Sequence, residues 1–301
     1  MTTQDNKIQN RWKKALFLFW IYTLIVILWG AWVRISHSGD GCGNHWPLCG
    51  GEFIPTEGLH KTWIEYTHRL MSGSYGLIVI YIFFKIKKIK SFSSWSKKLS
   101  IALLILMITE ALLGAILVKG QLVTVNDSFT RLLVMSFHQL NSFILTGVTY
   151  LLYRSFVEDS IEQNRNFQPF ILLKKHKWLL VAFLLLPITG AIAALSSTLF
   201  PTISVLQGIL DDFSQNSHLF IRLRVLHPLL ALSIASGFMI WCFMQNRQRL
   251  AFEFLGALLI GVITLATLSP VYLKLSHLLI AHWLWARVLQ LCVSLPDSSK
   301  R

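Results

Sequence analysis

The sequence predicts an all-α integral membrane protein, and two observations carry this prediction. First, 54% of the 301 residues are hydrophobic and only 14% are charged, with a mean hydropathy of +0.56. That is too little charge to cover a water-soluble surface of this size. Second, the apolar residues fall into long runs separated by short basic clusters. Helices satisfy their own backbone hydrogen bonds in lipid, so such runs predict membrane-spanning helices.

Eight apolar segments are long enough to cross a hydrocarbon layer, which takes about 20 residues of helix. The segment 251–268 is the weakest of them, because Gly256, Gly261 and Pro270 shorten it. The eight segments are residues 15–34, 66–84, 99–118, 132–153, 178–197, 221–244, 251–268 and 275–294.

The N-terminus is polar and basic, and the apolar run after it has no small-residue cleavage site. We therefore expect a retained first helix, and the lack of a presequence favours a bacterial source and its cytoplasmic (inner) membrane. The net charge of +14 does not indicate nucleic acid, because most basic residues cluster on alternate connections between apolar runs. By the positive-inside rule, these connections and both termini are cytoplasmic.

An internal repeat divides the chain into residues 1–160 and 161–301. Gly30 and Gly190, each followed by alanine, are 160 residues apart, and His68 and His227 are 159 apart. Each half then holds four helices. Two units with an even number of helices run in the same direction, which predicts a pseudo-twofold axis along the membrane normal.

Four histidines, two in each half, lie near the outer ends of their segments: His68, His138, His227 and His277. A pair of imidazoles facing each other across a four-helix bundle can hold a haem iron from both sides. A lone intramembrane histidine usually makes a helix–helix hydrogen bond, but four at matching depth favour ligation. Arginines at the same level are candidates to bind haem propionates through bidentate bonds: Arg69, Arg131, Arg222 and Arg224.

Glu65 precedes His68 by three residues and therefore shares its helix face. An ionisable group at such depth costs of the order of 2.5–3.5 kcal/mol, so it is usually functional or paired. Glu65 would orient the histidine or act as an acid or base, and the alternative is an interfacial charge cluster with Arg69. The second half has Arg224 three residues before His227, so the two halves differ chemically.

Two further polar residues lie within apolar segments. Glu110 is expected to make a packing hydrogen bond, with a role in a proton path as the alternative. His282 lies deeper than His277 and on another face of the last segment, so it is a reserve ligand.

The cysteines fall into two groups. Cys42 and Cys49 lie in the first outer loop, where a disulfide would stabilise the loop by roughly 2–3 kcal/mol. A redox-active thiol pair is the alternative. Cys242 and Cys292 lie near inner helix ends and are interpreted as buried apolar residues.

Several motifs together resemble the haem A synthase family over essentially the whole chain. They are the Gly-Cys-Gly-x-x-Trp-Pro-Leu-Cys loop from Gly41 to Cys49, the Glu65-x-x-His68-Arg69 motif, the Gly-Ala pairs of the first and fifth segments, and the His-Pro-Leu-Leu run that starts at His227. No single motif is specific, but their combination is.

The resemblance implies an oxidoreductase acting on a CH group. It would convert haem O to haem A by successive hydroxylation of the C8 methyl group to a formyl group, with water as the oxygen source. His68 and His138 would hold the substrate haem, with Glu65 essential beside them, and His227 and His277 would hold a resident haem b. The implied partners are haem O, haem O synthase, an electron acceptor and membrane lipid, and a homo-oligomer is compatible with the family.

Two departures from the family pattern stand out. Some relatives have a second cysteine pair in the loop after the fifth segment, whereas residues 196–218 contain none. Pro228 follows His227 where some relatives have arginine, which shifts the expected propionate contacts to Arg222 or Arg224.

Two other classes of protein fit part of the pattern. A dihaem b-type electron-transfer protein linked to quinol would use the same four histidines but would not need Glu65. A transporter built on parallel repeats would use Glu110, but the sequence has no convincing pair of broken helices.

Overall fold

The computed structural model describes residues 3–56, 59–89, 92–158 and 177–293. Across these ranges the regular structure is helical, apart from an isolated bridge between Cys49 and Glu52. This confirms the all-α prediction. The helices are α1 (Thr3–Ile35), α2 (His60–Lys88), α3 (Ser94–Lys119), α4 (Phe129–Glu158), α6 (Lys177–Leu199), α7 (Val205–Phe213), α8 (Leu219–Arg224), α9 (Leu226–Met244), α10 (Gln248–Ala266) and α11 (Val271–Val293).

Seven spans in the described ranges are both long and apolar enough to cross a membrane, namely α1, α2, α3, α4, α6, α8 with α9, and α10. The expected eighth span is not among them. Its helix, α11, has 23 residues and carries Lys274, His282 and Arg287 within the apolar run. The segment we expected to be weakest does qualify, because α10 begins at Gln248 and continues through its glycines.

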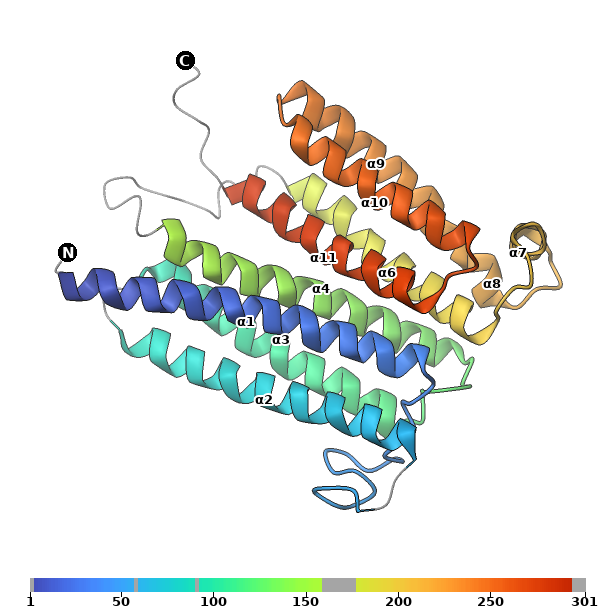
Figure 1. Ribbon diagram of the computed structural model, residues 1–301, viewed down its shortest axis with the longest axis horizontal. Helices are drawn as coiled ribbons and strands as arrows, with labels where there is room; N and C mark the ends of the chain where they lie inside the picture. Colours follow the sequence, from blue (N-terminus) through green and yellow to red (C-terminus); the bar gives the residue numbers. More distant parts are fainter. Residues whose placement is uncertain (1–2, 57–58, 90–91, 159–176, 294–301) are drawn as a thin grey trace.

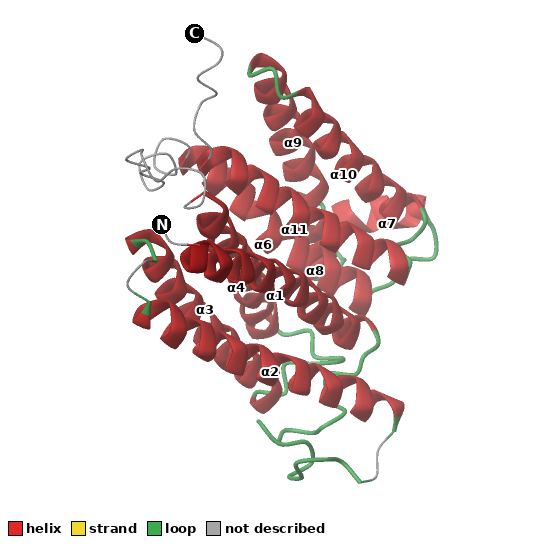
Figure 2. Cartoon of the chain, turned by 60° about the vertical axis from the view of Figure 1, so that its left-hand side comes forward, coloured by secondary structure: helices red, strands yellow, loops and turns green. Residues whose placement is uncertain are grey.

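The helices lie side by side and alternate in direction (Figure 1). Helices α2 and α3 lie on one side of the molecule and α9 and α10 on the other, while α1 and α4 meet α6 and α11 between them (Figures 1 and 2). Residues 36–56, α7 and the 267–270 connection lie at one end of the bundle (Figure 1), which we call the disulfide end.

One hydrophobic core runs through both groups of helices. A single cluster of buried side chains extends from Leu16 of α1 to Val293 of α11. At the junction, the rings of Phe143 of α4 and Trp285 of α11 have centroids 6.3 Å apart. Gly147 permits this contact, because a Cβ there would lie 2.4 Å from Nε1 of Trp285. The division at residue 160 into two domains stays a prediction, and the two halves share a continuous core.

The expected segment 221–244 is two helices that meet at Val225. The cause is Pro228, which has no N–H and whose ring displaces the carbonyl of Arg224 one turn earlier. The break lies two residues before His227 and so fixes where that histidine enters the bundle.

Helix α7 is not foreseen by the sequence analysis. It begins after Ser204, whose hydroxyl accepts a hydrogen bond from the Gln207 N–H. Its Asp212 binds Arg224 of α8, so α7 is anchored against the disulfide end of the second half.

Candidate functional site

Each of the four histidines lies against a glycine of a neighbouring helix. A Cβ at Gly30 would come within 2.9 Å of Cε1 of His68. The other pairs are His138 with Gly114, His227 with Gly190, and His277 with Gly261, for which the corresponding distances to Cε1 are 4.0, 3.2 and 3.2 Å. The glycines that mark the sequence repeat therefore provide the space that the imidazole rings occupy.

The four histidines lie at one level. Each is six to nine residues from the first residue of its helix at the disulfide end, when α8 and α9 are counted together. At 1.5 Å per residue this places them about 9–14 Å into the bundle.

The histidines approach each other within each half. The rings of His227 and His277 have centroids 6.2 Å apart and planes inclined by 82°. His68 and His138 lie near enough for a charge on one ring to act on the other. In both halves, helices that are not consecutive in the sequence bring two imidazoles together.

The His227–His277 pair fits a haem iron. An imidazole nitrogen binds a transition metal at about 2 Å, so two imidazoles on opposite sides of one ion have ring centroids about 6 Å apart. The separation of His227 and His277 matches this value. In addition, the Nδ1 atoms of His68, His138 and His277 are buried without a hydrogen-bond partner. Haem iron takes at most two ligands from the protein, whereas structural zinc takes four.

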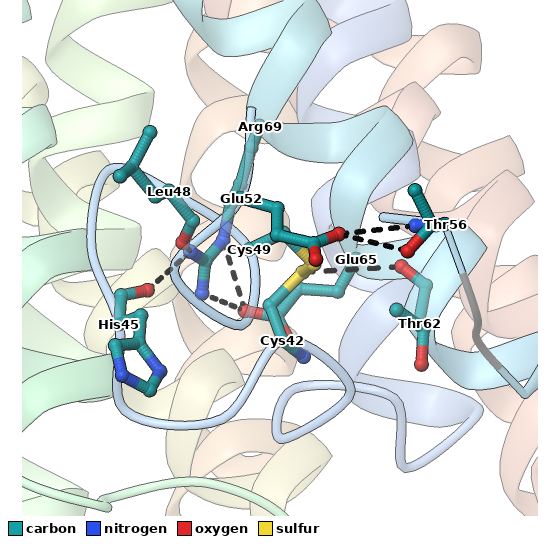
Figure 3. The surroundings of a disulfide bond; sticks show 9 residues. All are labelled: Cys42, His45, Leu48, Cys49, Glu52, Thr56, Thr62, Glu65 and Arg69. Atoms are coloured by element: carbon teal, nitrogen blue, oxygen red, sulfur yellow. Dashed lines mark hydrogen bonds and ion pairs between the residues drawn. A yellow bond between two sulfur atoms is a disulfide. The ribbon is translucent and has the colours of Figure 1, made fainter. Parts of the chain in front are cut away.

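Glu65 is 3% exposed and joins α2 to the first loop. Its Oε2 accepts a hydrogen bond from the backbone N–H of Cys42 at 2.8 Å, and its Oε1 accepts bonds from Nε and Nη2 of Arg69. Nη1 of Arg69 donates to the carbonyl oxygens of His45 and Leu48 (Figure 3). The carboxylate is therefore held between the loop and the arginine, one helical turn from His68.

The structure contains the disulfide between Cys42 and Cys49, and both residues are buried (Figure 3). The covalent link closes the loop directly over Glu65. Cys242 is buried and free, in agreement with its interpretation as an apolar residue. The side chain of Cys292 lies outside the described residues.

Two of the arginines considered for propionates are bound to protein groups. Arg69 bonds to Glu65 and the loop, and Nε of Arg224 donates to Asp212 at 2.6 Å while its Nη2 donates to the Gly208 carbonyl at 3.0 Å. Arg222 is exposed.

Arg131 keeps free donor capacity in a buried position. It is 2% exposed and its Nη1 donates to the Thr124 and Asn126 carbonyls, but its Nε is buried without a partner. Among the four arginines, Arg131 is thus the best placed to receive an additional carboxylate.

Two further cations, Arg34 near Arg131 and Lys274 near Arg34, were missed by the sequence analysis. Arg34 donates from Nη1 to the Ala194 carbonyl at 2.7 Å, which ties α1 to α6, and it lies near enough to Arg131 and Lys274 for their charges to interact. A signal existed in the spacing. Arg34 follows Gly30 by four residues and therefore shares a helix face with the glycine that His68 contacts. Lys274 precedes His277 by three residues and shares its helix face.

Glu110 and His282 occupy different surroundings. Glu110 of α3 has its Oε1 3.4 Å from Nδ1 of His138, so it belongs to the N-terminal histidine pair. His282 is 1% exposed and packs on Phe143 with ring centroids 4.2 Å apart. The ring that lies against His227 is that of His277, and the role of His282 as a reserve ligand stays a prediction.

The chain matches known proteins over most of its length. Residues 13–289 match the family described as cytochrome oxidase assembly protein. A protoheme IX farnesyltransferase of Thermus thermophilus is 32% identical over 307 residues, which cover 96% of this chain and 50% of that protein. The chain thus spans about half the length of this relative.

Proteins named heme A synthase match a shorter region. That of Alkalihalophilus pseudofirmus is 48% identical over 96 residues, which cover 32% of each chain. That of Bacillus cereus is 42% identical over 92 residues, or 31% of this chain and 30% of the relative. With the family match across nearly the whole chain, these similarities show that the protein belongs to the haem A synthase family of cytochrome oxidase assembly proteins.

Proposed function

We propose that this protein converts haem O to haem A in a bacterial cytoplasmic membrane. The observation that carries the proposal is the presence of two imidazole pairs at one level, of which only the N-terminal pair is accompanied by carboxylates. In the proposed arrangement, His68 and His138 hold the substrate haem O, and His227 and His277 hold a resident haem b.

The propionates of the haems are proposed to bind at the disulfide end. Arg131 would donate its free Nε, Arg34 would add positive charge beside it, and Lys274 would add positive charge beside Arg34. Each of these three cations lies one or two helical turns from a site histidine, or from the glycine that a site histidine contacts, on the same face of its helix.

The proposed reaction oxidises the C8 methyl group in two rounds. Addition of water to the methyl carbon releases two electrons and two protons and leaves an alcohol. A second round followed by loss of water gives the formyl group. The iron porphyrin supplies the capacity to withdraw electrons, which pass to an acceptor.

The proposed role of Glu65 follows from its charge and its position. A carboxylate in a water-poor site interacts strongly with nearby positive charge. Glu65 would stabilise the electron-deficient methyl carbon or accept the proton of the attacking water. Arg69 and the Cys42 N–H hold the carboxylate in place for this task.

The proposed neighbours follow from the chemistry of the substrate. Haem O carries a farnesyl-derived chain, so a farnesyl transfer to protohaem must supply it. A Thermus relative named for that transfer contains a region similar to this whole chain within a protein about twice as long. We therefore propose haem O synthase as a partner. By the positive-inside rule, we also propose that both chain termini and the basic connections lie in the cytoplasm.

A direct experiment tests this function. The chain is expressed in bacterial membranes that contain haem O but no haem A, and the extracted pigments are separated by chromatography. We expect haem A to form only when the chain is present. If the purified protein contains haem B alone and haem O remains unchanged, the chain is an electron carrier and the proposal is wrong.

A further inference from the structure

Glu110 is a carboxylate within a membrane-spanning helix, and its hydrogen-bond donors are neutral. Its Oε2 accepts a bond from Nδ2 of Asn141 at 2.6 Å, and its Oε1 accepts one from the hydroxyl of Ser142. Asn141 is itself fixed, since it donates to the Leu106 carbonyl and accepts from Thr109. Keeping an ionisable group at this depth costs of the order of 2.5–3.5 kcal/mol, which calls for a specific function.

The carboxylate of Glu110 and its donors lie against one imidazole, that of His138. Oε1 of Glu110 lies 3.4 Å from Nδ1 of His138, a buried atom that has no hydrogen-bond partner among the described residues. The two α4 donors follow His138 by three and four residues and therefore share its helix face. Gly114, one turn after Glu110, lies against the same ring. Helix α3 thus presents both the space and the acceptor that this imidazole needs.

The second half has no counterpart of this network. Gly261 faces His277 as Gly114 faces His138, but the residue four positions before it is Ala257. The residues three and four positions after His277 are Ile280 and Ala281, which donate no side-chain hydrogen bond. Among the described residues, a carboxylate with neutral donors beside a site histidine therefore occurs in the half that contains Glu65.

We propose that Glu110 is a positioning residue for His138. It accepts a hydrogen bond from Nδ1–H, which fixes the tautomer that leaves Nε2 free for iron and sets the rotation of the ring. A carboxylate acceptor also makes the imidazole a more electron-rich ligand, which stabilises the ferric state. This inference rests on the proposed function and distinguishes the substrate haem from the resident haem by its surroundings.

The test is a titration of the purified, haem-free, full-length chain with ferric haem b, followed by redox titration of the loaded protein. The variants are Glu110→Gln, Ser142→Ala and His138→Ala. Glu253→Gln is the control, since Glu253 is also a carboxylate in a spanning helix but pairs with Arg287.

We expect Glu110→Gln to weaken one of two binding phases about tenfold, the phase that His138→Ala abolishes. The midpoint potential of that haem should rise, and the other haem should be unchanged. Ser142→Ala keeps the carboxylate and should give a smaller shift in the same direction, which provides a readout even if Glu110→Gln does not fold. Glu253→Gln should match the parent in both phases.

Two results would overturn the inference while the proposed function stands. One is a His138-dependent phase whose affinity and potential stay at parental values in Glu110→Gln and Ser142→Ala. The other is an equal loss in both phases, which would indicate a general structural role. A parent chain without any His138-dependent phase would instead contradict the haem site itself and with it the proposed function.

Discussion

Replacement of Glu65 by glutamine is expected to lower haem A formation about 100-fold or more while the protein stays folded. Glutamine keeps an oxygen that can accept the Cys42 N–H bond, but it removes the negative charge next to the proposed site of the substrate haem. Loss of a positioned acid–base group typically costs 10²- to 10⁴-fold in rate. The measurement is haem A formed per purified chain when haem O is supplied.

The matched control for this variant is Glu52→Gln. Glu52 lies in the same loop, but its side chain is exposed. Among the described residues, Thr56 is the only one that donates hydrogen bonds to its carboxylate. The Glu52→Gln variant should retain the parental rate. Retention of the haem proposed to lie between His227 and His277, together with the Cys42–Cys49 disulfide, shows that Glu65→Gln is folded. Parental haem A formation by Glu65→Gln would remove Glu65 from the mechanism.

Replacement of Arg69 by glutamine is expected to destabilise the chain by about 3–5 kcal/mol. The variant leaves Glu65 charged and buried without its cation, and breaking a buried pair in this way typically has that cost. It also removes the donor to the His45 and Leu48 carbonyls, so the loop loses its attachment to α2. Thermal unfolding in detergent and the rate of disulfide reduction measure both effects.

Arg222→Gln is the control for this experiment, because Arg222 lies at the same end of the bundle but is exposed. Its stability should match that of the parent. The experiment also separates two roles for Arg69. If Arg69→Gln has parental stability but reduced haem affinity, Arg69 binds a propionate and does not clamp the loop.

The helices could be predicted from the sequence because a segment that crosses lipid must be apolar and must satisfy its own backbone hydrogen bonds. A run of about 20 apolar residues has few alternatives to a spanning helix. The break at Val225 could also have been anticipated, since Pro228 makes a continuous helix unfavourable. Helix α7 was not anticipated, because its nine residues are too few for a membrane span and the helix is held by the tertiary contact between Asp212 and Arg224.

The candidate site could be predicted only in part for a related reason. Depth follows from position along a helix, so the level of the four histidines was accessible from the sequence. Which side chains meet depends on the neighbours of each helix, which spacing alone does not give. The approach of Arg34 to Arg131 and the contact of Glu110 with His138 are of this second kind.

The central claim is that each histidine pair holds one haem. Low-temperature electron paramagnetic resonance of the purified chain, loaded with ferric haem, tests it most directly. We predict two low-spin signals typical of bis-imidazole ligation, with His138→Ala removing one and His277→Ala removing the other. Survival of both signals in either variant, or a parent that binds no haem, would contradict the claim.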